Sequence, residues 1–104
     1  MFIFTITAKP YPNNKDVDKD VTGASIKAWI NFPEREAAEM VANFYIHQNG
    51  WGPENTTEAL WVEEKDIAEE DREFYREALE YGSTFIFNIW GGKPQAAGDE
   101  TDEE

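Results

Sequence analysis

Four short stretches of this chain alternate apolar and polar residues, and this period-two pattern limits the possible folds more than any other feature. Successive side chains of a β-strand point to opposite faces, so alternation of this kind indicates half-buried strands. The stretches cover residues 2–8, 24–31, 59–64 and 84–90. Two intervening segments instead repeat apolar residues at helical spacing. The predicted order of elements is therefore β-β-α-β-α-β.

The two helices have recognisable ends. Pro33 suits a first helical turn, and Gly50 suits the left-handed residue after a helix, so the first helix is expected between them. Its core-facing stripe is predicted to comprise Ala37, Val41, Phe44, Tyr45 and Gln48, with Met40 at the edge. The second helix is expected to start near a capping box formed by Asp66 and Glu69 and to run to about Tyr81, where Gly82 ends it. Its predicted apolar side comprises Ile67, Phe74 and Ala78, extended by Tyr75 and Leu79.

These elements predict an α+β two-layer sandwich, in which a four-stranded mixed sheet carries both helices on one face. Strands separated by a helix favour parallel crossovers, with residues 2–8 adding either as an antiparallel neighbour or as an insertion. Residues 51–57, which contain Gly52 and Pro53, are expected to form a loop. The domain is predicted to span residues 1–90. Residues 91–104 lack a hydrophobic anchor and are predicted to form a disordered acidic tail.

Three tryptophans, Trp29, Trp61 and Trp90, lie out of phase with the aliphatic residues that should face the helices. Together with Ile3 and Ile86 they are predicted to form an aromatic interaction surface on the uncovered sheet face. Three indoles at ~150–250 Å² each would expose on the order of 450–750 Å², as much as the largest patch on a typical monomer. A homodimer that buries sheet against sheet is the leading interpretation. Cover by the tail or a loop, or a phase shifted by one residue, is the first alternative, and a platform for a ligand is the second.

The formal charge of the 104-residue chain is −13. Residues 91–104 hold five acids and one lysine, a net −4, which leaves −9 for the rest. Such a surface repels phosphate backbones and anionic lipids, so neither direct nucleic-acid binding nor membrane binding is expected. A second hypothesis uses the charge directly: an acidic inhibitor, an immunity protein or a nucleic-acid mimic would block a basic site on another protein.

Composition also bears on location. The apolar runs are much shorter than the roughly 20 residues of a membrane helix. The first ten residues have neither a basic segment nor a signal-peptide cleavage site. The absence of cysteine excludes disulfides and thiolate chemistry and is compatible with the cytoplasmic location that we expect.

No segment predicts a metal or catalytic site. Asp16, Asp18 and Asp20 resemble the start of an EF-hand loop, but Val21 replaces the required glycine and Lys27 the required glutamate. A solvated loop, with weak calcium binding at most, is expected there.

Catalytic chemistry finds equally little support. His47 has no second histidine or cysteine with which to build a zinc site. The 22 acids guarantee close carboxylate pairs somewhere, so their number alone does not indicate a glycosidase. The sequence therefore predicts no catalytic residue and no cofactor. It predicts a small non-catalytic domain that self-associates as a homodimer, or binds another protein, through its aromatic sheet face.

Overall fold

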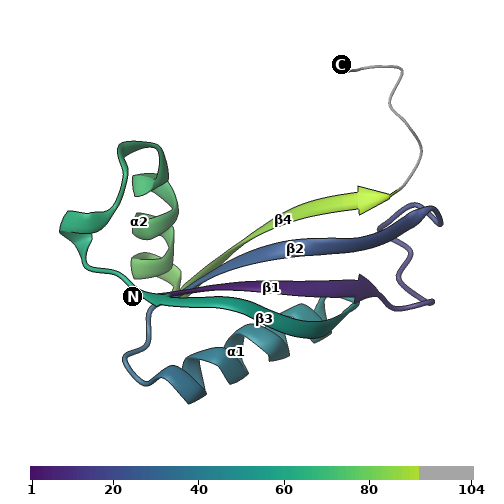
Figure 1. Ribbon diagram of the computed structural model, residues 1–104, viewed down its shortest axis with the longest axis horizontal. Coiled ribbons are helices and arrows are strands. Elements are labelled where there is room, and N and C mark those ends of the chain that lie inside the picture. Colours follow the sequence, from purple (N-terminus) through teal and green to yellow (C-terminus); the bar gives the residue numbers. More distant parts are fainter. Residues whose placement is uncertain (92–104) are drawn as a thin grey trace.

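The computed structural model describes residues 1–91, which form a four-stranded antiparallel sheet with one helix on each face (Figure 1). The strands are β1 (Phe2–Pro10), β2 (Val21–Ile30), β3 (Trp51–Trp61) and β4 (Ser83–Gly91). The helices are α1 (Arg35–Gln48) and α2 (Arg72–Tyr81), and two 3-10 turns (Glu64–Asp66 and Glu69–Asp71) precede α2. The predicted α+β class and the element order are confirmed. The predicted tail lies, apart from Gly91, outside the described residues.

The strand order is β3-β1-β2-β4, and every neighbouring pair is antiparallel. The expected parallel pairs do not form. β2 and β3 do run in the same direction on either side of α1, but β1 lies between them and pairs with both. β3 and β4 are the two edges of the sheet, so the connection through α2 crosses its whole width.

Alanines bring α1 close to the sheet. On the helix, Ala38, Ala42 and Ile46 are fully buried, and they face a sheet surface that contains Ala24 and Ala28 of β2. Small side chains on both surfaces permit this close approach, and close packing there completes the larger core. The prediction that the stripe of Val41, Phe44 and Tyr45 forms the core contact is wrong, because all three are exposed and only Tyr45 reaches the sheet, at Phe85 of β4.

The smaller core lies on the other face of the sheet, under α2. Trp29 is only 1% exposed and packs with Ile3, Ile67 and Ala78, while the Phe74 ring lies 6.2 Å from the indole. The indole N–H has no hydrogen-bond partner among residues 1–91, which costs roughly 1–3 kcal/mol. The prediction that both helices share one face is therefore wrong: alternation identifies the two faces of a sheet but not which helix covers which.

β3 is longer than predicted, since the expected loop of residues 51–57 belongs to the strand. Its pairing with β1 shifts register between Thr5 and Ile6 and again between Thr7 and Ala8, which marks two irregularities. Pro53 is tolerated because one side of an edge strand needs no backbone partner. Trp51, at the start of β3, is buried in the α1-side core.

The helix ends follow the expected chemistry at shifted positions. The Glu34 carboxylate caps α1 by accepting hydrogen bonds from the backbone N–H groups of Glu36 and Ala37. The capping box lies between Glu63 and Asp66 at the first 3-10 turn, three residues before the predicted box. Gly50 and Gly82 take the left-handed conformation, with φ of 90° and 93°, immediately before β3 and β4. These two glycines end the helical segments as the sequence predicts.

Candidate interaction surface

The free edge of β4 is unusual for this chain because it carries no charge. None of the residues Ser83–Gly91 is acidic or basic, although 30% of the whole chain is charged. β4 pairs with β2 on one side only, so its outer row of backbone N–H and C=O groups is free within residues 1–91. A free, uncharged strand edge is a ready template for pairing with another strand.

Apolar side chains of β4 reach one edge of the exposed side of α1, where Phe85 contacts Tyr45. Phe85, Phe87 and Ile89 are paired in register with Ala28, Ile26 and Ala24, and so point to the face that α1 covers. The exposed side of α1 presents the stripe that was expected to be buried. We call the combined set the α1–β4 surface; it comprises Met40, Val41, Phe44, Tyr45, Phe85, Phe87 and Ile89.

A ring stack joins the two parts of the α1–β4 surface. The rings of Tyr45 and Phe85 lie parallel within 10°, with centroids 4.0 Å apart. Phe44 is 63% exposed and Met40 71%, so much of the surface is open to solvent. With aromatic side chains of ~150–250 Å² each, the exposed area is on the order of 500 Å². This reaches the size of the largest patch on typical monomers, roughly 300–600 Å².

The residues predicted to form the aromatic surface do not lie together. Ile3 and Trp29 are buried beneath α2, so they cannot contact a partner in this fold. Trp61 is opposite Phe2 in register, on the α1 face, and the two rings make an edge contact at 4.9 Å. Ile86 is half-buried and packs against the core under α2, so Trp90 alone of this set lies on the uncovered part of that sheet face. The prediction of one shared aromatic face is therefore wrong.

Trp90 lies over a glycine at the open end of that face. A Cβ atom built on Gly23 would come within 2.7 Å of the indole ring of Trp90. The strand needs glycine here because the indole occupies the space of a side chain. The neighbouring residues on this face are polar, among them Thr7, Ser25 and Asn88, so the surface around Trp90 needs no apolar cover.

No protein-family model, curated protein or solved structure matches the chain.

The other features singled out in the sequence remain solvated. Asp18 accepts a hydrogen bond from the backbone N–H of Asp20, a short turn within the aspartate loop. His47 is exposed, and its Nδ1 lies 2.7 Å from the Tyr11 hydroxyl. Residues 1–91 contain no group of three histidine, cysteine or acidic side chains that could hold a metal ion. No helix in the same range is long and apolar enough to cross a membrane.

Part of the signal for the α1–β4 surface was present in the sequence. Residues 38–48 carry two apolar stripes, one of large side chains and one of Ala38, Ala42 and Ile46. A helix has only one side for its own sheet, so a second apolar stripe indicates a second contact. Hydrophobicity alone favours the larger residues as the core stripe, and this misplaced the core.

Proposed function

We propose that this protein is a non-catalytic interaction module that self-associates through β4 and the α1–β4 surface. The observation that supports the proposal is an uncharged strand edge, unpaired within residues 1–91, that the Tyr45–Phe85 stack joins to the exposed apolar side of α1. Either feature alone has ordinary explanations. Together they match the two needs of edge-to-edge association, which are backbone partners and buried apolar area.

The proposed dimer has a two-fold axis perpendicular to the sheet. Two copies of β4 related by this axis run antiparallel and present the same face, so two four-stranded sheets become one of eight strands. Both copies of α1 then lie on the same side of the joined sheet, and the two α1–β4 surfaces meet across the axis. This is an isologous interface, in which one patch contacts its own copy.

The energy balance allows association. Burial of about 500 Å² of apolar surface per protomer at ~25 cal/mol/Å² contributes on the order of 12 kcal/mol from each copy. Association costs an estimated ~4–15 kcal/mol in lost freedom. A standard interface buries about 800 Å² per partner, and the paired β4 edges would add the difference.

Charge favours this surface over any other. Residues 40–48 and 83–91 contain no acidic, lysine or arginine side chain, whereas the chain carries −13 in total. Two copies that meet here keep their acids apart and desolvate none of them. Contact through an acidic region would instead bury unpaired carboxylates, which is costly.

The test is the association state of Phe44→Glu, measured by sedimentation equilibrium over about a hundredfold range of concentration. The wild type is expected to dimerise, and Phe44→Glu to be a folded monomer, because a charge at this exposed position opposes burial of the interface. Ile89→Lys, which places a cation on the β4 edge, should act in the same way.

Trp61→Glu is the matched control. It makes the same change of charge at an aromatic residue of similar exposure, since Trp61 is 50% exposed and Phe44 63%. Trp61, however, lies at the end of β3. It should dimerise like the wild type. A monomeric wild type at high concentration, or loss of the dimer in Trp61→Glu with Phe44→Glu unaffected, would refute the proposal.

The competing function, an acidic protein that blocks a basic partner, is favoured by one observation. Residues 63–80 around α2 hold nine acids against three basic residues. The remaining acids of residues 1–91 lie in three other places: the aspartate loop, the first turns of α1, and β3. A mimic needs its acids on one surface, so this dispersal supports it less well than self-association. A monomeric wild type would make it the preferred proposal.

A further inference from the structure

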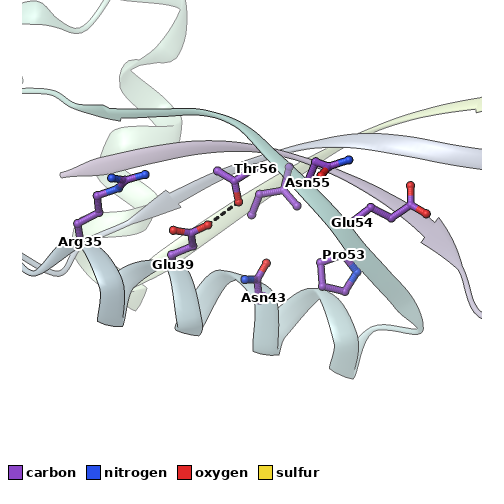
Figure 2. Close-up of a pocket in the computed structure, with 8 residues that line it drawn as sticks. Arg35, Glu39, Asn43, Pro53, Glu54, Asn55 and Thr56 are labelled. Carbon is purple, nitrogen blue, oxygen red and sulfur yellow. Dashed lines mark hydrogen bonds between the residues drawn. The ribbon is translucent and has the colours of Figure 1, made fainter.

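A cavity of about 460 Å³ lies between α1 and β3, on the opposite side of α1 from the α1–β4 surface (Figure 2). Three successive turns of the helix line it, through Arg35, Glu39 and Asn43. The other wall is the segment 53–56 of β3, and the buried Ile6 forms the floor. Its volume falls in the usual range of small-molecule sites, ~300–1,000 Å³.

The irregularity of β3 shapes the cavity. The two register shifts in the pairing of β3 with β1 fall on either side of Asn55 and Thr56. β-bulges re-aim side chains and are frequent beside functional sites. Here the bulged segment presents Thr56 to the helix: its hydroxyl donates to Glu39 Oε2 over 2.6 Å, the bond drawn in Figure 2.

Of the charged side chains that line the cavity, Arg35 and Glu39 remain available to a ligand, whereas Glu54 does not. The carboxylate of Glu54 forms an ion pair with Lys9 at 3.7 Å, outside the helix wall. Within residues 1–91, the Arg35 guanidinium has no ion-pair partner, although Glu39 lies one helical turn away. The cavity thus offers one free cation next to one half-buried carboxylate that Thr56 holds in place.

We propose that this cavity binds a small zwitterion, a free α-amino acid with a neutral aliphatic side chain. Its carboxylate pairs with Arg35, which can bind both oxygens, and its ammonium group donates to Glu39. Residues four apart on a helix have Cβ atoms about 5–6 Å apart, so a compact ligand with both charges on neighbouring carbons reaches both partners. Pro53 borders the space for the side chain, and Glu54 disfavours an acidic one.

Ligands with a single charge fit less well. A simple anion at Arg35 is repelled by Glu39 and by the net charge of the protein, and a simple cation at Glu39 is repelled by Arg35. A zwitterion brings no net charge into the cavity and satisfies both groups. This pattern distinguishes the proposed site from a general ion site.

The test is a titration of the full chain with L-valine, followed by amide chemical shifts in NMR. Saturable shifts are expected at Asn43 and Thr56, while acetate and methylamine at the same concentrations should produce little change. Arg35→Gln and Glu39→Gln should each weaken binding about tenfold or more, since each removes one charge-assisted pair. Glu39→Gln keeps an oxygen that accepts from Thr56, so the cavity should keep its shape.

Glu36→Gln and Arg76→Gln, which change the same charges outside the cavity, are the matched controls and should bind as the wild type does. The proposal is overturned if no saturable shift occurs by about 10 mM L-valine, if acetate binds equally well, or if Glu39→Gln binds unchanged. Phe44→Glu should retain binding, because the cavity and the α1–β4 surface lie on opposite sides of α1. Failure of the site and failure of self-association are thus separate results.

Discussion

The two edge strands of the sheet differ in almost every property that governs association. β3 contains Pro53, two acids (Glu54 and Glu58) and two register irregularities, and both acids are engaged by neighbouring side chains, Lys9 and Thr5. β4 is free of charge and proline, and its one register shift is close to its end, opposite Val21–Gly23. Proline, charges and bulges are the devices by which proteins keep an edge from pairing.

The contrast indicates that the two edges have different roles. β3 is protected, and its irregular segment serves the cavity beside α1. Within residues 1–91 the outer edge of β4 is open, and the Tyr45–Phe85 stack joins β4 to the exposed apolar side of α1. If neither edge had a role in association, β3 and β4 would be expected to carry similar charges and irregularities. The difference between the two edges therefore supports a specific use of β4.

The largest expected effect compares one tryptophan from each edge, at the same end of the sheet. Trp51→Ala should lower the free energy of unfolding by about 3–5 kcal/mol, because Trp51 is buried against Phe87. Trp90→Ala should cost about 1 kcal/mol or less, since this residue is half exposed. Urea denaturation in the Phe44→Glu background excludes any contribution from association. Equal costs would show that the two edges are packed alike.

Removing the protection of β3 should produce larger assemblies. With Pro53, Glu54 and Glu58 all replaced by threonine, both edges of the sheet would be open, so dimers could join further copies. Light scattering should then show species beyond the dimer. Glu36→Thr with Glu64→Thr removes the same two charges away from β3 and should leave the dimer unchanged. If that control also forms large assemblies, net charge rather than edge protection limits association.

Salt should tighten the dimer by a smaller amount. Two copies of an acidic chain repel each other, and added salt screens this repulsion: the Debye length falls from about 10 Å at 0.1 M to about 3 Å at 1 M. The dissociation constant from sedimentation should therefore decrease a few-fold over this range. An interface held by ion pairs would weaken with salt, and such a result would argue against the uncharged β4 edge as the contact.

The smallest expected effect is on the stability of the protected β3 edge. There the α-ammonium group of Met1 donates a hydrogen bond to the carbonyl of Val62, just beyond β3. Burial lowers the pKa of this group below its ordinary value of 8.0, and the nearby Glu63 carboxylate opposes the shift. Between the folded pKa and 8.0 the unfolded chain binds more protons, so stability should rise slightly as pH increases through this window. N-terminal acetylation should abolish the increment in urea denaturation. An increment that survives acetylation belongs to another group.

Local patterns determined the elements themselves. Alternation in residues 2–8 and 24–31 predicted β1 and β2, because each has one strictly apolar face. Gly50 and Gly82 marked the ends of the helical segments correctly, because only glycine adopts positive φ without strain. The apolar side of α2 was predicted in part: Ala78 is buried and Phe74 half-buried, and Ile67 is buried just before the helix, whereas Leu79 is exposed.

The tertiary structure alone decided which apolar surfaces are used within the chain. Trp29 became core because α2 crosses to the face opposite α1, and no local pattern encodes on which side of a sheet a helix packs. Ala38 and Ala42 displaced Phe44 and Tyr45 from the core because the facing alanines of β2 permit a close approach, and this depends on residues far apart in the sequence. The sequence determined how much apolar surface the protein has, whereas packing decided which part remains for a partner, since one sheet face accommodates only one side of a helix.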